Sequence, residues 1–196
     1  QGGDCVVAEG ATYHGSFTVP TDVSLVASAG ATVLLVGDSA EEPALRVMGG
    51  PRSTIRDIKV ASALGVGIVV DPGPAFLVAV SVTKAGRSGL LASCTGDECA
   101  ADAMESQFTD LEIAQCGLGL WIAGARASVH GGRIAEGQAQ SLTTGHGVIA
   151  SHGAVATLDG TVIEDNQELG VLVDGAAGTR AVLSNVKVLR NLGRGV

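Results

Sequence analysis

A glycine followed by an apolar residue occurs six times at the start of a short apolar segment, between residue 67 and the end of this chain. The segments begin at Gly67, Gly89, Gly119, Gly147, Gly170 and Gly195. Their spacings of 22, 30, 28, 23 and 25 residues are typical of stacked repeats, in which each unit covers the apolar face of its neighbour. The repeat therefore predicts a solenoid.

The residues between these glycines indicate β-structure. Apolar side chains recur in two columns, which are Ile55, Leu77, Phe108, Val129, Leu158, Leu183 and Val60, Val82, Ile113, Ile134, Ile163, Val188. A third column precedes the second by two residues: Ile58, Val80, Leu111, Gly132, Thr161, Val186. A spacing of two is the strand period, whereas a helix would show spacings of three and four. We predict an all-β, single-stranded parallel β-helix whose units are strand, turn, strand, with no substantial helix.

Two parts of the chain resemble right-handed parallel β-helix proteins of the pectin-lyase-like superfamily. The opening segment 7–19 with its continuations 23–26 and 30–33 is similar to the first turn of such proteins, and in units 162–171 and 186–196 an Asn closes a turn before the Gly. The resemblance implies a right-handed β-helix of about seven coils. It does not imply one activity, because the superfamily includes lyases, hydrolases, epimerases, tailspikes and adhesins.

The resemblance also implies a role for the two turn asparagines. In the superfamily, stacked asparagines form hydrogen bonds along the helix axis and satisfy turn amides that would otherwise be buried unpaired. The alternative is that Asn166 and Asn191 are present only because Asn tolerates left-handed backbone. Cys116 falls in the same column, where we expect a small buried side chain rather than a reactive thiol.

Length and charge limit the domain organisation and the partners. We expect residues 1–196 to form one domain, with an N-terminal cap and first strand over 1–15 and inserted loops over 95–106 and 137–144. Because the chain begins with Gln1 and stops as another strand should start, we expect it to be part of a longer protein. The net charge of −8 without basic clusters argues against nucleic acid and anionic membranes. No apolar run is long enough to span a membrane.

The four cysteines bear on the cellular compartment. Cys94 and Cys99 are separated by four residues in an insertion, and we predict that they form a disulfide, which indicates a secreted, periplasmic or cell-surface protein. The alternative is metal binding, but two thiols without a nearby His make an incomplete zinc site. We therefore expect no metal and no cofactor. Cys5 and Cys116 should lie about three coils apart, roughly 14 Å, too far to pair.

One motif resembles catalytic machinery. Gly145-His146-Gly147 is similar to the Gly-His-Gly segment of polygalacturonases, in which carboxylates on the preceding coils cleave the glycosidic bond. The preceding coils, 119–124 and 89–93, contain no carboxylate, so we predict that His146 is a turn residue. His130 and Asp159 should lie roughly 5 Å apart on adjacent coils, followed by Ser184. We interpret them as an exposed structural pair, and no catalytic residue is predicted.

The first strand of each unit presents an outward apolar column. If its alternate residues fill the core, then the remaining ones point outward: Val69, Leu91, Trp121, Ile149 and Leu172. Such a stripe marks an interface or groove, unless an inserted loop covers it. We therefore expect a non-catalytic binding or structural role toward a glycan or protein partner, or self-association through the stripe or an open C-terminal coil. The alternative is a divergent polysaccharide lyase or glycoside hydrolase acting on acidic polysaccharide, with its acids outside this chain.

Overall fold

The chain folds into a solenoid of β-strands. The computed structural model describes residues 4–7, 10–62, 64–94, 105–139, 144–175 and 177–193. Within these ranges the chain forms strands, turns and loops but no helix, and so contains no helix that could span a membrane. The strands form three parallel sheets, which we name A, B and C, with eight, eight and seven strands. These numbers agree with the prediction of about seven coils.

Each coil contributes one strand to each sheet. Sheet A contains β1 (Asp4–Val7), β4 (Ser24–Ala27), β7 (Thr54–Arg56), β10 (Phe76–Val78), β13 (Ser106–Thr109), β16 (Arg126–His130), β19 (Val155–Asp159) and β22 (Arg180–Ser184). Sheet B contains β2 (Thr12–His14), β5 (Val33–Gly37), β8 (Ile58–Ser62), β11 (Ser81–Thr83), β14 (Glu112–Ala114), β17 (Arg133–Ala135), β20 (Val162–Glu164) and β23 (Lys187–Leu189). Sheet C contains β3 (Phe17–Val19), β6 (Leu45–Val47), β9 (Ile68–Val70), β12 (Ser88–Ser93), β15 (Leu118–Ala123), β18 (Val148–Ser151) and β21 (Val171–Asp174).

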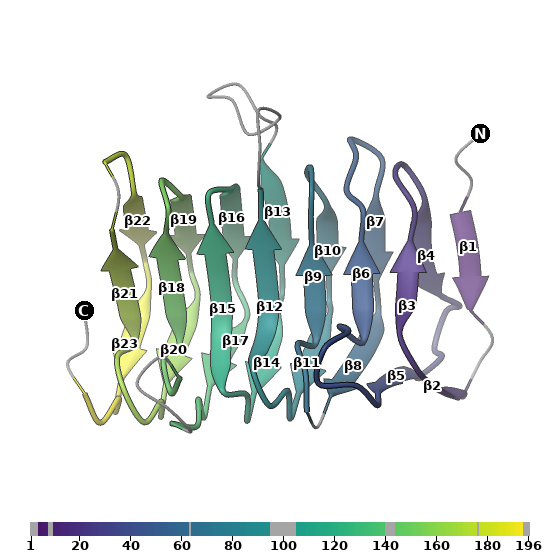
Figure 1. Ribbon diagram of the computed structural model, residues 1–196, viewed down its shortest axis with the longest axis horizontal. Coiled ribbons are helices and arrows are strands. Elements are labelled where there is room, and N and C mark those ends of the chain that lie inside the picture. The colour runs from purple at the N-terminus through teal and green to yellow at the C-terminus, as the bar shows by residue number, and fades with distance from the viewer. Residues whose placement is uncertain are drawn as a thin grey trace.

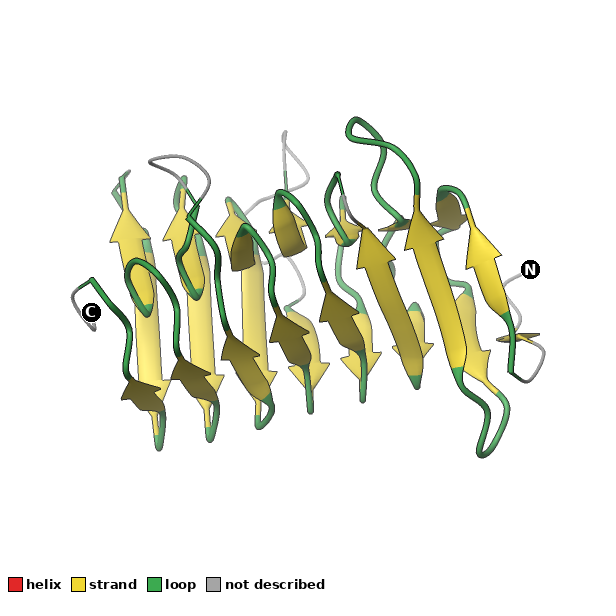
Figure 2. Ribbon diagram, turned by 90° about the horizontal axis from the view of Figure 1, so that it is seen from below, coloured by secondary structure: helices red, strands yellow, loops and turns green. Residues whose placement is uncertain are grey.

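The winding of the chain can be followed in Figure 1. Each coil runs up through sheet C at the front and down through sheet A behind it, then returns through sheet B, while the chain advances from right to left. Upward travel at the front combined with leftward advance defines a right-handed coil. Figure 2 shows the strands of successive coils side by side along the long axis. The predicted right-handed parallel β-helix is confirmed.

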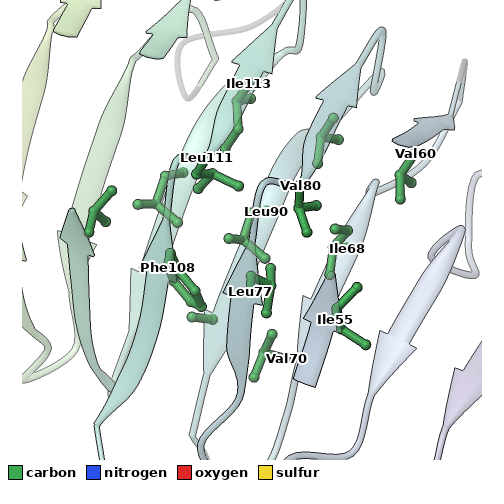
Figure 3. Close-up of a cluster of buried hydrophobic side chains, with 14 of the residues drawn as sticks. Ile55, Val60, Ile68, Val70, Leu77, Val80, Leu90, Phe108, Leu111 and Ile113 are labelled. Carbon is green, nitrogen blue, oxygen red and sulfur yellow. The ribbon is translucent and has the colours of Figure 1, made fainter. Parts of the chain in front are cut away.

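The core consists of the predicted columns. Ile113 lies opposite Val82 on one side and Ile134 on the other, and all three side chains are buried. The third column also points inward, as Val80 and Leu111 do in Figure 3. Stacking like residues in parallel register lets each coil cover the apolar side chains of the next. On the last described coil Val173 and Leu183 are exposed, because no described coil packs against their far side.

The repeated glycines lie where the chain turns from sheet B into sheet C. A Cβ atom on Gly119 would lie 2.4 Å from Ile134 Cγ2 and 2.4 Å from the carbonyl oxygen of Gly147. Gly89 has the same relation to Ile113, at 2.5 Å from its Cγ2. The glycine of the repeat is therefore required because the backbone passes directly over a β-branched core residue, with no room for a side chain.

The predicted unit of two strands is wrong, because each coil has three. The second predicted strand is divided between sheets A and B by one residue with left-handed backbone, and this residue is often not glycine: Asp57, Ala79, Asp110 and Asn185 have φ between 51° and 57°. A single left-handed residue turns the chain sharply without interrupting the apolar spacing. Ala is not a typical residue at such a turn, so the turn at Ala79 could not be predicted from the sequence pattern.

The predicted boundaries need two small corrections. Residues 1–15 contain two complete strands, β1 and β2, which belong to different sheets. Strand β13 begins at Ser106, so the first insertion ends one residue earlier than predicted. Most of this insertion, 95–104, and residues 140–143 of the second lie outside the described residues.

Candidate functional site

The outward apolar stripe consists of Val69, Leu91, Trp121, Ile149 and Leu172, and it crosses five strands at the front of Figure 1. Each member lies directly opposite the next in the parallel register of sheet C. The flanking residues Leu120 and Ile122 are fully buried in the core, whereas Trp121 is half-buried. Alternation along the strand therefore places the stripe on the outer face of the sheet.

The stripe is less exposed than a fully solvated surface. Val69 and Ile149 are only 7% and 8% exposed, while Leu91, Trp121 and Leu172 are half-buried. Side chains on neighbouring strands of one face are close enough to shield each other. Leu91, Trp121 and Leu172 thus remain partly available at the surface, whereas Val69 and Ile149 are covered by their neighbours.

Trp121 has a fixed orientation. Its indole Nε1 donates a hydrogen bond of 2.9 Å to Ser151 Oγ. Ser151 lies two residues beyond Ile149, the register partner of Trp121, so the indole reaches diagonally across to the next strand. Ser151 Oγ is also 2.8 Å from His152 Nδ1. Ser151 is buried, so this Ser-His contact anchors the indole and does not present a nucleophile to solvent.

A second outward column runs beside the stripe. Ser93, Ala123, Ser151 and Asp174 lie opposite one another in register, and Asp71 occupies the corresponding position after β9. Asp71 has one buried carboxylate oxygen, Oδ1, without a hydrogen-bond partner among the described residues. The intervening coils separate Asp71 from Asp174, as the sequence predicted, so these two carboxylates do not form a common site.

The polar pair predicted on sheet A is in register but not in contact. His130 lies opposite Asp159, and Asp159 lies opposite Ser184. The Asp159 carboxylate accepts a hydrogen bond of 3.0 Å from Asn185 Nδ2, and the ion pairs of the described residues do not include one between His130 and Asp159. Without that contact the Asp does not orient the His as it would in a nucleophilic site.

His146 is a buried residue at the corner before β18. It is 6% exposed, and its Nδ1 accepts a hydrogen bond of 3.2 Å from the backbone N–H of Leu169. Burial lowers the pKa of the imidazole, although the Glu168 carboxylate acts in the opposite direction. The prediction of a turn residue is correct in position, but neither the burial of His146 nor its role as a hydrogen-bond acceptor could be predicted from the residue pattern.

A cluster of carboxylates and arginines lies on the ridge between sheets B and C. Glu164 accepts from Arg133 Nε at 2.7 Å and from Arg190 Nη2 at 2.6 Å, and Arg190 Nε also binds Asp165 at 2.7 Å. These arginines lower the pKa of both carboxyls. A glycosidase needs one carboxyl with a raised pKa as its acid. The cluster is therefore a stacked ion-pair network rather than an acid-base pair.

The asparagine column forms a hydrogen-bonded ladder. Asn166 is completely buried, its Oδ1 accepts from the N–H of Gly137 at 2.9 Å, and its Nδ2 donates to Asn191 Oδ1 at 2.8 Å. The ladder implied by the family resemblance is thus present.

Cys116 in the same column is buried with a free thiol, and desolvation raises its pKa to about 11. Such a thiol is unreactive at neutral pH.

The disulfide between Cys94 and Cys99 stays a prediction, because Cys99 lies outside the described residues. In the part of the chain that the structure describes, no group of three or more His, Cys, Asp or Glu side chains is arranged to hold a metal ion.

Comparison with known protein families, curated proteins and solved structures finds no match to this chain.

Proposed function

We propose that this protein is a non-catalytic binding module that uses the outer face of sheet C. The observation that carries the proposal is the stripe, and in particular Trp121 at its centre. A half-exposed Trp held in one orientation offers a large contact surface at little entropic cost on binding. Aromatic anchors near the middle of an interface contribute most of its binding energy.

The proposal includes membership of the pectin-lyase-like superfamily and a secreted, periplasmic or cell-surface location. The superfamily assignment is supported by the coil handedness and by the ladder of Asn166 and Asn191. The location depends on the predicted disulfide of Cys94 and Cys99. A lyase or hydrolase that uses acids of this chain is not our proposal, because the carboxylates of Glu164 and Asp165 are already paired with arginines.

A glycan and an apolar protein surface are the two partner classes that fit the stripe. The indole can stack on a sugar ring, whereas the aliphatic members pack better against protein side chains. Trp121 is the only Trp, so its fluorescence reports on contact at the stripe. If the partner is a glycan, we expect the emission to shift on titration with a soluble polysaccharide of neutral, acidic or basic character. If the protein self-associates, we expect the emission to shift as the protein concentration is raised, in parallel with association measured by sedimentation.

Substitution of Trp121 by Ala separates a binding role from a structural one. Phe76→Ala is the matched control, because Phe76 is also a half-buried aromatic residue on an outward strand position, but in sheet A. We expect Trp121→Ala to weaken association at least tenfold and to lower the urea midpoint no more than Phe76→Ala does. If no polysaccharide and no self-association alters Trp121 emission, and Trp121→Ala is the more destabilised variant, the stripe is a structural cover and the proposal fails.

A further inference from the structure

The corner at His146 contains a hydrogen bond whose acceptor can titrate. Nδ1 of His146 faces the backbone N–H of Leu169 at 3.2 Å, which places the ring proton of the neutral imidazole on Nε2. Leu118 occupies the position equivalent to His146 on the preceding coil, as Leu169 does on the following coil. The backbone N–H of Leu118 donates to the carbonyl oxygen of Arg87 at 2.7 Å. A carbonyl does not gain a proton in acid, so only the Leu169 corner depends on pH.

Protonation of His146 would bring two donors face to face. The imidazolium carries a proton on Nδ1, which would oppose the N–H of Leu169 in a site where the side chain is 6% exposed. An unsatisfied buried donor is costly, and a buried unpaired charge costs more. Glu168 is the charged group that favours the protonated form, and it is exposed to solvent. It therefore compensates only in part.

The corner is hydrogen-bonded to the coils on both sides of it. The carbonyl of His146 accepts from the N–H of Gly119 at 3.0 Å, and the N–H of Gly147 donates to Leu169 at 2.9 Å. Residues 144–147 connect the second insertion to β18, which carries Ile149 of the stripe. Loss of the His146 acceptor would loosen residues 144–147 and the start of β18 together.

We propose that His146 is an acid-sensitive latch, which holds this corner closed when neutral and releases it when protonated. The latch closes above the pKa of an exposed histidine, about 6.5. Because its neutral form is favoured in the folded state, the folded corner binds fewer protons than the open one, and closure weakens as the pH falls below about 6.5. One proton changes the opening equilibrium by at most tenfold per pH unit. The inference rests on the contacts of His146 and is independent of the proposed binding role.

Amide hydrogen exchange of Leu169, normalised to that of Leu118, tests the latch. Between pH 7.5 and pH 5 we expect the ratio of their protection factors to fall, by up to tenfold per pH unit below about 6.5, after correction for intrinsic exchange rates. His146→Asn retains an acceptor oxygen near the position of Nδ1 without a titratable group. In that variant the ratio should not change with pH.

Either of two results would overturn the latch: a ratio that is constant in the unmodified protein, or the same decrease in His146→Asn. A second measurement does not depend on the folding of the variant. In the imidazole ¹⁵N spectrum of the unmodified protein, Nδ1 of His146 should be unprotonated at pH 7.5, with a titration midpoint below 6.5. A protonated Nδ1 at pH 7.5, or a midpoint at or above 6.5, would exclude the proposal.

Discussion

The glycine at the corner between sheets B and C makes Gly119→Ala an informative perturbation. The added Cβ would lie 2.4 Å from the Gly147 carbonyl oxygen and 2.4 Å from Ile134 Cγ2, distances well inside normal van der Waals contact. Neither neighbour can move freely, since Ile134 is fully buried and the carbonyl of Gly147 accepts a hydrogen bond of 2.8 Å from Leu120. The clash must therefore move the backbone of two coils.

The magnitude follows from known costs of overpacking. An extra methyl group in a tightly packed core costs about 1–3 kcal/mol, and two short contacts with constrained neighbours place Gly119→Ala at about 2–3 kcal/mol. The reduced entropy of the unfolded chain offsets about 0.4–1 kcal/mol of this. With a urea m-value of about 2 kcal/mol per M, we expect the midpoint of unfolding to fall by about 1 M.

A second glycine provides the control for backbone effects. Gly153 has φ +81°, and a Cβ there would meet no atom within 4 Å. Gly153→Ala therefore carries backbone strain of about 1 kcal/mol but no clash, and should be the milder variant in the same urea titration. If Gly119→Ala unfolds at the same urea concentration as the unmodified protein, or later than Gly153→Ala, the steric explanation of the repeat is refuted.

Three further predictions concern the asparagine column and the cysteines. Asn166→Ala leaves the Gly137 amide without its acceptor in the buried ladder and should lower the free energy of unfolding by about 1–3 kcal/mol. The exposed control Gln167→Ala should change it by less than about 0.5 kcal/mol, and equal effects in urea unfolding would contradict the role of the ladder. Because burial raises the pKa of Cys116 to about 11, iodoacetamide at pH 8 should leave it unmodified in the folded protein, and peptide mass mapping after unfolding without reductant should find Cys116 modified and Cys94 and Cys99 still unmodified. Alkylation of Cys116 in the folded state would refute the first expectation, and alkylation of Cys99 after unfolding would refute the disulfide.

The sequence by itself determined the fold class, the number of coils and the identity of the core columns. These properties depend on local spacing: a period of two assigns Ile113 and Ile134 to one face, and recurrence every 22 to 30 residues brings equivalent positions into register. The same reasoning placed Trp121 and its neighbours on the outer face and aligned His130 with Asp159.

Only the tertiary structure decided which of these aligned residues interact. Register fixes Cα positions, but side-chain torsions decide whether His130 reaches Asp159, and Asp159 binds Asn185 instead. The three-stranded coil depended on left-handed backbone at residues such as Ala79, which has no compositional signature. The burial of His146 and its bond to Leu169 likewise depend on how two coils pack at one corner, because the environment of a side chain is set by neighbours that are distant in sequence.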